Sequence, residues 1–392
     1  MDQIQGGTMG VMTNESPLIQ VPPGLKGVAV TDTAIGDVRG REGFYHYRQY
    51  SAVDLAEHVS FEDVWHLFVQ GHLPDDAERR AFAGEVAPRR VVPAGVLPAL
   101  APIAGVGAQG PLDGLRSALS VVAAAHKMRP VLDIDRVERR LDALTLAAVT
   151  PTLVAALHQL QHGRDPIEPR PDLGTAANLL WMIGDVQLDP ARVRALEQYL
   201  IATIDHGFNA STFTARVIAS TGADVGACVV GAVGALSGPL HGGAPSRALD
   251  LLDEIGTADR IDAVVGPKLE SGQRIMGFGH AVYQGEDPRS RLLRQVAVDQ
   301  DGPRVELAQA VEQRVIELLA QRYPERDLRT NVEFYAGVVM ESCGVPSSLF
   351  TPAFATSRIV GWGAHVLEQA DDPRILRPSA RYTGPEAPAS LP

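Results

Sequence analysis

The chain has 392 residues, of which 45% are hydrophobic and 21% charged, and its formal net charge is −12. This composition is typical of a globular protein with a sizeable core, divided into about two units. The negative charge argues against a nucleic-acid-binding surface, which needs a basic face. Only Cys228 and Cys343 are present, too few for a disulfide framework, so we expect a cytoplasmic protein.

The chain shows no targeting or membrane-spanning pattern. Its first ten residues have neither a basic nor an apolar region, so no secretory signal is predicted. The longest weakly polar run, residues 225–240, is shorter than the ~20 apolar residues that cross a bilayer. We therefore expect a buried helix there and no contact with a membrane.

In chain order, the first pattern is a weak alternation over residues 27–33, which predicts a strand that pairs with residues 43–48. Residues 61–70 predict a helix, because Ser60 and Asp63 resemble a capping box and apolar residues recur at i, i+3, i+4 and i+7. Gly71 and Pro74 then end it.

Further helices are predicted near Ala176 and over residues 192–204, 225–240, 245–255, 303–323 and 359–368. Residues 93–111 and 163–172 are rich in proline or polar residues and predict irregular connections. The fold is therefore expected to be mainly α-helical, with little sheet.

Three histidines lie in settings that suit a ligand: His206 at a helix end, His241 between Pro239 and two glycines, and His280 after Gly279. Glycine permits close backbone approach to a ligand. His241 precedes a predicted helix, whose N-terminus disfavours the imidazolium, so it can donate a hydrogen bond to a carbonyl that becomes an enolate. A capping or core role for His206 and a ligand-free loop role for His280 are the alternatives.

Glu333 stands between Val332 and Phe334, an apolar setting that raises a carboxyl pKa towards that of a useful base. Its alternative role is a surface or helix-capping carboxylate. Arg289, Arg358 and Arg377 are either carboxylate ligands or solvated surface residues. Taken together, these groups suit proton abstraction next to a carbonyl, on a substrate that carries carboxylates.

Several of these segments together resemble the citrate synthase family over nearly the whole chain. The sharpest similarities are Leu236–Ala244, Met276–His280, Asp287-Pro288-Arg289 and Arg377-Pro378, with weaker ones at residues 24–28, 47–48, 54–56 and 71–74. The resemblance implies a two-domain helical fold, with a large domain at 1–242 and 346–392 and a smaller mobile domain at 243–345. It also implies a homodimer with a shared active site.

The resemblance further implies condensation of acetyl-CoA, a co-substrate, with oxaloacetate, without a permanently bound cofactor or a metal. His241 would hydrogen-bond the thioester carbonyl, His280 would polarise the ketone and Glu333 would remove a methyl proton. The implied substrate carboxylate ligands are His206, Arg289, Arg358 and, across the dimer interface, Arg377. The implied CoA-binding loop comprises Ile275, Met276, Gly277, Phe278 and Gly279.

The sequence departs from the family pattern at three positions: Glu333 replaces the usual aspartate, Gln284 a usual Lys or Arg, and Gln49 a usual glycine. A 2-methylcitrate synthase that uses propionyl-CoA is one alternative, and a weakly active or non-catalytic paralogue that binds CoA or carboxylates is another. A metal hydrolase is disfavoured, because the three histidines and Glu333 have no short ligand spacing.

Overall fold

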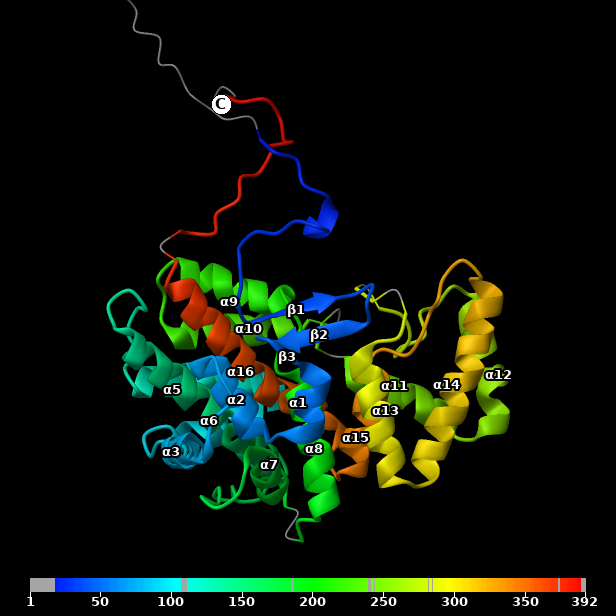
Figure 1. Ribbon diagram of the computed structural model, residues 1–392, viewed down its shortest axis with the longest axis horizontal. Coiled ribbons are helices and arrows are strands. Elements are labelled where there is room, and N and C mark those ends of the chain that lie inside the picture. Colours follow the sequence, from blue (N-terminus) through cyan, green and yellow to red (C-terminus); the bar gives the residue numbers. More distant parts are fainter. Residues whose placement is uncertain are drawn as a thin grey trace, which may run out of the picture. The chain divides into compact units, whose positions relative to one another are not determined.

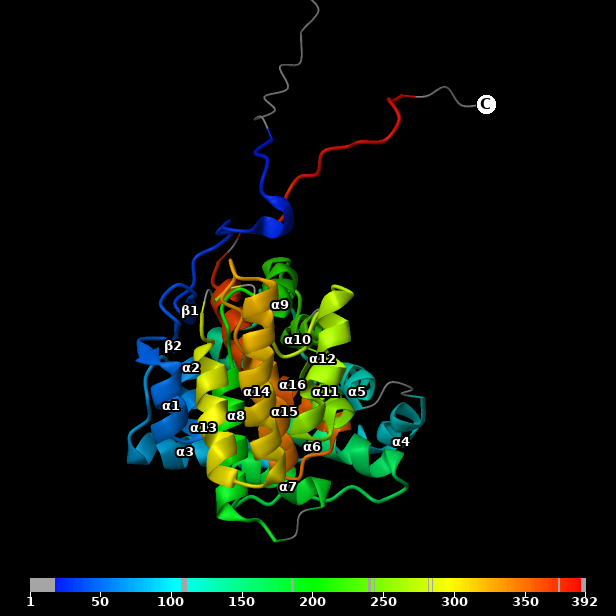
Figure 2. The ribbon, with the colours of Figure 1, turned by 90° about the vertical axis from the view of Figure 1, so that its right-hand side faces the viewer.

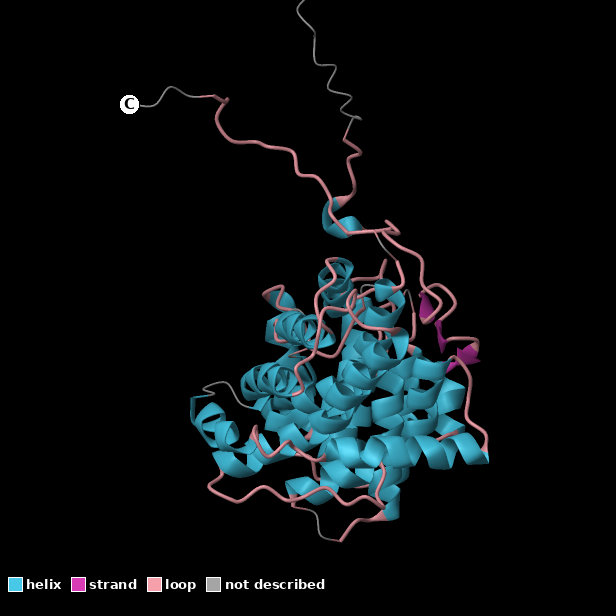
Figure 3. Cartoon of the chain, turned by 90° about the vertical axis from the view of Figure 1, so that its left-hand side faces the viewer, coloured by secondary structure: helices cyan, strands magenta, loops and turns pink. Residues whose placement is uncertain are grey.

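The computed structural model describes residues 18–106, 111–184, 187–238, 241–242, 244–280, 282–283, 285–372 and 374–388. Contacts divide the chain into a unit of Thr33–Ile375 and a second unit of Met1–Asp32 with Leu376–Pro392. The described residues contain sixteen α-helices and one small sheet, which Figure 3 shows in cyan and magenta. The prediction of a mainly helical fold is therefore confirmed.

The larger unit begins with a three-stranded antiparallel sheet. Its strands are β1 (Gly36–Arg39), β2 (Phe44–Tyr47) and β3 (Tyr50–Ser51), with β2 in the middle. The strand predicted in residues 43–48 is confirmed, but its expected partner at 27–33 was wrong, because β1 takes that place. Gly27 has a φ of +74°, so the chain is not extended at that residue. The second unit contains the 3₁₀ helix η1 (Pro23–Leu25).

The first half of the larger unit is helical after the sheet. The predicted helix at 61–70 is confirmed, with a capping box between Ser60 and Asp63 and a left-handed Gly71 at its end. The elements are α1 (Ala52–His58), α2 (Phe61–Gln70), α3 (Asp76–Val86), η2 (Ala87–Arg90), α4 (Leu97–Val106), α5 (Pro111–Ala125), α6 (Arg136–Gln161) and α7 (Thr175–Ile183).

Helix α4 corrects the prediction that residues 93–111 are irregular. Pro98 falls in the first turn of α4, where its missing N–H has no intrahelical acceptor. Leu100 and Ala104 lie one turn apart and are both buried in the core. Tertiary packing therefore stabilises a helix that proline content argued against. The predicted loop at residues 163–172 is confirmed.

Helix α6 is long and apolar enough to cross a membrane, judged by length and composition alone. In the structure, 89% of its most apolar 18-residue window is buried inside the protein. Core helices of soluble proteins share this pattern.

The second half of the larger unit supplies the helices that surround the site. They are α8 (Pro190–Thr203), α9 (Ala210–Ser220), α10 (Val225–Leu236), α11 (Ala244–Ile255), η3 (Ala258–Arg260), α12 (Ile261–Glu270), α13 (Pro288–Gln300), α14 (Pro303–Arg322), α15 (Val332–Ser342), η4 (Ser347–Leu349) and α16 (Phe350–Ala370). The predicted helices are confirmed, although α10 ends at Leu236 and α16 begins at Phe350, well before the predicted start.

Within this unit, Figures 1 and 2 both show α12 beside α14. Helices α11 and α13 pack on α15, while α16 packs on α6, α8 and α9. Helix α8 contacts α13, α15 and α16, so it stands where these two groups of helices meet. The domain boundaries at 243 and 345 stay a prediction.

The close approach of α16 to α8 depends on one glycine. A Cβ atom at Gly361 would lie 2.2 Å from the carbonyl oxygen of Ile204, just beyond the end of α8. The missing side chain therefore lets α16 lie directly against the turn that follows α8. Cys228 and Cys343 are both buried, and burial raises the pKa of each thiol to about 12, as expected of core residues.

Candidate active site

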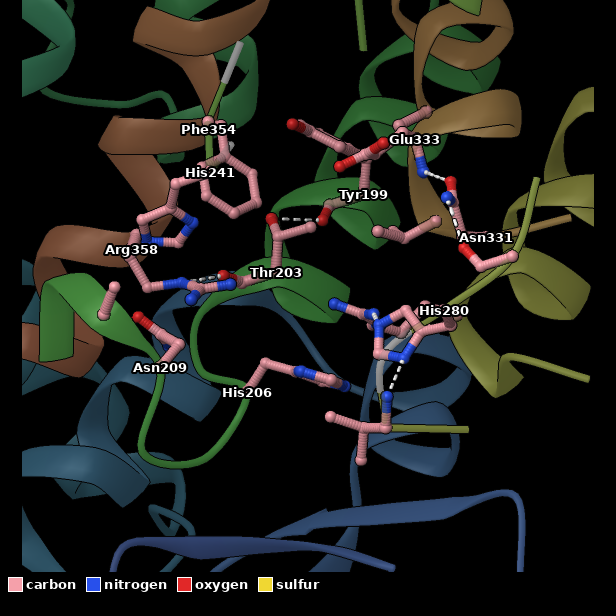
Figure 4. A pocket seen from close by; sticks show the side chains of 17 residues that line it. Tyr199, Thr203, His206, Asn209, His241, His280, Asn331, Glu333, Phe354 and Arg358 are labelled. Carbon is pink, nitrogen blue, oxygen red and sulfur yellow. Dashed lines mark hydrogen bonds between the residues drawn. The ribbon is translucent and has the colours of Figure 1, made fainter. Parts of the chain in front are cut away.

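One cavity of about 420 Å³ collects most of the predicted site residues. Its lining comes from α8, α9, α13, α15 and α16 and from the loops before α9, α11, α13 and α15. In Figure 4, Glu333, Tyr199 and Phe354 lie in the upper part of the view, and His206 and His280 in the lower part. The predicted residues that line it are His206, His241, Gly279, His280, Arg289, Glu333 and Arg358.

His206 lies in the tight turn between α8 and α9. The turn is held by Asp205, whose carboxylate accepts from the N–H of Gly207 at 3.1 Å and lies 3.3 Å from Nε2 of His365 in α16. Gly207 has a φ of +62°, which a glycine adopts without strain. Burial, together with Arg289, His280 and Arg358, holds the pKa of His206 well below its usual value, so its ring is neutral.

His280 is fixed by its own backbone. Its Nδ1 accepts hydrogen bonds from the N–H groups of Val282 at 2.9 Å and Tyr283 at 3.1 Å. Burial, helped by Arg289, lowers the pKa of His280 to about 4, so the ring is neutral and its proton is on Nε2. Nε2 lies 3.2 Å from a nitrogen of Arg289, which is also a donor. Two donors this close can both donate to one acceptor oxygen of a ligand.

Arg289 is paired before any ligand binds. Its Nε and Nη2 donate to the two carboxylate oxygens of Asp287, at 3.0 and 2.8 Å. Burial alone would lower the pKa of Arg289, but Asp287 outweighs it and raises that pKa above its usual value. Asp287 also caps α13 and accepts from the N–H of Val332, the first residue of α15, at 3.2 Å. Arg289 must therefore bind a substrate carboxylate through the N–H groups that do not donate to Asp287.

Arg358 is held by α8. It is 2% exposed, its Nε donates to the carbonyl of Thr203 at 2.8 Å, and its guanidinium lies 4.6 Å from the ring centre of Phe354. Burial lowers its pKa, which nearby Asp205 partly restores. A buried guanidinium with free N–H groups is a strong site for a carboxylate.

His241 lies across the cavity, before α11. Its Nε2 is 2.8 Å from Oγ of Ser211 in α9, which leaves Nδ1 for a ligand. Burial, with a smaller effect of Arg358, lowers the pKa of His241 to about 4. The ring is therefore neutral at physiological pH, as the sequence predicted, although burial rather than the helix N-terminus is the main cause.

Glu333 lies in the first turn of α15. Burial raises its pKa to about 7, against the lowering effect of Arg289. Its N–H donates to Oδ1 of Asn331, which caps the helix, at 3.0 Å. This direction agrees with the raised pKa that the apolar neighbours of Glu333 predicted. A carboxyl that is half ionised near neutral pH suits a general base.

The segment with Glu333 and the loop with His280 are joined by a short β-bridge between Phe278 and Thr330. Asn331 strengthens it, because its Nδ2 donates to the carbonyl of Gly279 at 2.9 Å. Gly277, with a φ of +85°, leaves no room for a side chain, since a Cβ would lie 2.9 Å from the ring of Phe334. The two groups are therefore positioned by one local structure.

Comparison with known proteins agrees with this geometry. A sequence model described as "Citrate synthase, C-terminal domain" matches residues 24–379. The citrate synthase of Acidithiobacillus ferridurans is 36% identical over 374 residues, covering 92% of this chain and 95% of its own. The chain belongs to the citrate synthase family. It is an enzyme of the acyltransferase type that catalyses a condensation.

Solved structures of citrate synthases share the fold. The enzyme from Thermotoga maritima has a TM-score of 0.83 and 33% identity, over 95% of this chain and 98% of its own. The enzyme from Thermoplasma acidophilum, solved as a ternary complex with carboxymethyl coenzyme A and oxaloacetate, has a TM-score of 0.87 and 26% identity, over 95% and 98%.

Some of the predicted citrate synthase residues are not among those that line the cavity. Arg377 is exposed and belongs to the second unit. Of the predicted CoA loop, Gly279 lines the cavity, whereas Ile275 is buried in the core and Phe278 packs beside Phe334. Gln284 lies outside the described residues. Gln49 is an exposed turn residue.

The structure adds residues that sequence analysis missed. Three of them each form a hydrogen bond with a predicted site residue: Tyr283 with His206, Asp287 with Arg289, and Ser211 with His241. Tyr199 lines the cavity, and no described atom pairs with its buried hydroxyl. Asp287 was within a motif already noted, and Tyr283 lies three residues after His280. Nothing in the sequence near Ser211 or Tyr199 indicates the cavity.

In the described part of the chain, one group of side chains could hold a metal ion by distance, and it lies away from the cavity. It comprises His66, His72 and Glu78, whose ligand atoms lie within 4.8 Å of one another. These groups already satisfy each other: Nδ1 of His66 lies 3.0 Å from the carbonyl of His72, and Nε2 of His72 lies 2.9 Å from Glu78. Among the described residues, the three predicted histidines and Glu333 do not form the ligand cluster that a metal hydrolase would need.

Proposed function

We propose that this enzyme condenses acetyl-CoA with oxaloacetate and hydrolyses the product to citrate and CoA. The observation that carries the proposal is one cavity that holds Glu333, whose pKa is raised to about 7, with three neutral histidines and two buried arginines. A base of this strength, neutral hydrogen-bond donors and carboxylate ligands are what a Claisen-type condensation of a dicarboxylate requires.

The acyl side of the reaction uses Glu333 and His241. The ionised carboxylate of Glu333 removes a proton from the methyl group of the thioester. His241 donates a hydrogen bond through Nδ1 to the thioester oxygen, which becomes an enol oxygen, and this requires the Ser211 hydroxyl, 2.8 Å from Nε2, to donate to that nitrogen. A neutral imidazole suits this step, because its weak acidity matches that of the enol.

The ketone side uses His280 and the arginines. Nε2–H of His280 donates to the ketone oxygen of oxaloacetate and makes its carbon electrophilic. Arg289, Arg358 and His206 hold the carboxylates, so the ketone carbon meets the enol carbon at bonding distance. A carbon–carbon bond forms, the ketone oxygen gains a proton, and water then cleaves the citryl thioester and releases CoA.

The proposal is tested by incubating the purified enzyme with acetyl-CoA and oxaloacetate and identifying the products by mass. Citrate and free CoA, formed only when both substrates are present, are the expected result. Formation of 2-methylcitrate from propionyl-CoA at a much higher rate would assign the chain to the 2-methylcitrate branch instead.

We also propose that the enzyme is a homodimer whose sites are each completed by Arg377 of the other subunit. The support is the family resemblance at Arg377-Pro378 and a cavity in which Arg289 is already neutralised by Asp287. Mixing an Arg377→Ala subunit with a His280→Ala subunit should restore activity, since one hybrid site is intact. Verified heterodimers without rescue would contradict a shared site.

The location of the enzyme is proposed to be cytoplasmic. Two buried cysteines and an acidic composition support this, because neither needs an oxidising compartment. Cell fractionation with an antibody against the chain tests it, and recovery in a secreted or membrane fraction would overturn it.

A further inference from the structure

Tyr283 contacts three of the predicted substrate-binding residues at once. Its hydroxyl lies 2.9 Å from Nε2 of His206, and its backbone N–H donates to Nδ1 of His280 at 3.1 Å. The guanidinium of Arg289 lies 5.9 Å from the centre of its ring. The side chain is only 5% exposed, so it belongs to the interior of the site.

The direction of the bond to His206 follows from the available acceptors. In the described residues, His206 is the one hydrogen-bond partner of the Tyr283 hydroxyl. A phenol proton in the interior needs an acceptor, because leaving it unpaired is costly. The nearby guanidinium of Arg289 offers only donors. Tyr283 therefore donates, and Nε2 of His206 accepts.

This bond decides which nitrogen of His206 carries the proton. Arg289 in α13, His280 in its loop and Arg358 in α16 all face His206, and with burial they keep its pKa low. Tyr45 of β2 packs against the ring, with 5.8 Å between ring centres, and brings no charge. A neutral imidazole has one N–H. With Nε2 as acceptor, that N–H is on Nδ1.

We propose that Tyr283 is a positioning residue that fixes His206 as the Nδ1–H tautomer, so that Nδ1 is its donor to a carboxylate of the substrate. The inference rests on the proposed function, because it takes oxaloacetate as the ligand. It assigns a part in substrate binding to a residue that touches the substrate only through His206.

The test is calorimetric binding of oxaloacetate to the full-length enzyme and to Tyr283→Phe between pH 5.5 and pH 8. The substitution keeps the ring and the backbone N–H and removes only the hydroxyl. Without that donor, the neutral ring is no longer locked in one tautomer. Burial, Arg289, His280 and Arg358 still keep the pKa of His206 low in the variant.

The expected result is therefore a loss of affinity together with a change of tautomer. Tyr283→Phe should bind oxaloacetate about tenfold more weakly than the unaltered enzyme at every pH in this range, the scale of a lost hydrogen bond to a charged group. By ¹⁵N NMR, the N–H of His206 should be shared between Nδ1 and Nε2 in Tyr283→Phe, whereas in the unaltered enzyme it stays on Nδ1.

Tyr45→Phe is the matched control. It removes another buried hydroxyl beside His206, but that hydroxyl donates to the carbonyl of Ala202 at 3.2 Å and not to an imidazole. Its Kd ratio should stay near one at every pH. A Tyr283→Phe ratio near one, or an unchanged Nδ1–H tautomer of His206 in Tyr283→Phe, would overturn the inference, since packing damage alone does not move the proton of His206.

If Tyr283→Phe does not fold, the tautomer is read from the unaltered enzyme by ¹⁵N NMR of its histidine rings, with the His206 signals assigned by their loss in His206→Asn. A protonated Nδ1 and an unprotonated Nε2 are expected, and the reverse pattern overturns the inference. If the unaltered enzyme neither binds oxaloacetate nor releases CoA, the proposed function fails. If it does both, and Tyr283→Phe binds oxaloacetate with the same Kd at every pH, only the proposed role of Tyr283 fails.

Discussion

The side-chain amide of Asn331 donates a hydrogen bond to the carbonyl of Gly279 at 2.9 Å, and this bond ties the capping residue of α15 to the loop that ends in His280. The same side chain accepts from the N–H of Glu333 at 3.0 Å. Glu333, the proposed base, and His280, which is proposed to polarise the ketone, are therefore held together, although 53 positions separate them in the chain. Such rigidity holds reacting atoms in an attack geometry, where errors of about 1 Å cost ~100-fold in rate.

Glu333 is the group on which this account of the reaction depends. Glu333→Gln should lower kcat by at least ~100-fold, the usual contribution of a general base, and leave oxaloacetate binding nearly unchanged. Glu333→Asp should gain little or lose activity, because the carboxylate retreats by about 1.5 Å from a site built for the longer side chain. Steady-state kinetics measures both, with exposed Glu306→Gln as the control. A large gain in Glu333→Asp would mark the chain as a weakened relative.

The pH dependence of the rate follows from the same carboxyl group. Because burial raises the pKa of Glu333 to about 7, the base is mostly protonated below pH 6 and mostly ionised above pH 8. We predict that kcat/KM for acetyl-CoA rises with pH and levels off above about pH 8. His241 and His280, with pKa values of about 4, add no step in this range. A flat profile from pH 5.5 to pH 8 would exclude Glu333 as the titrating base.

The two histidines that are proposed to be catalytic should be essential for activity and dispensable for folding. His241→Ala and His280→Ala should each abolish measurable condensation, because each removes a hydrogen bond to an oxygen that gains charge. Their helix content should stay unchanged, since both rings face the cavity. Thiol-release kinetics and far-UV circular dichroism check this, with His58→Ala, an exposed residue of α1, as the control. Near-normal turnover in either variant would remove that residue from the mechanism.

Gly277 should be intolerant of a side chain for two separable reasons. It has a φ of +85°, and a Cβ would lie 2.9 Å from the ring of Phe334. Gly277→Ala should displace the bridge to Thr330 and cost activity by at least ~100-fold through misplacement of His280. Gly272→Ala, where φ is +73° with open space around it, carries the backbone strain alone. Equal activity in the two variants would show that the contact with Phe334 is unimportant.

The sequence predicted those parts of the fold that local physics determines. The capping box of Ser60 and Asp63 and the apolar spacing after it mark α2 correctly. Local signals were wrong at α4, where core packing of Leu100 and Ala104 outweighs proline content, and at residues 27–33, where β1 takes the place of the predicted strand.

The same limit applies to the site. Residues in glycine-rich motifs, such as His241 and His280, were recognisable along the chain. Tyr283 and Ser211 were not, because their function lies in a contact with a histidine 77 or 30 positions away. Such partners are set by tertiary structure, and neither periodicity nor spacing records them.

The central claim is tested most directly by thiol release from acetyl-CoA and from propionyl-CoA, each with oxaloacetate, in one assay with the purified enzyme. The account predicts release that requires oxaloacetate, with a higher kcat/KM for acetyl-CoA. One methylene in an apolar pocket is worth ~1–3 kcal/mol, so the preference should be at least about tenfold. No release from either acyl-CoA, although oxaloacetate binds, would contradict the account and identify the chain as a non-catalytic binding protein.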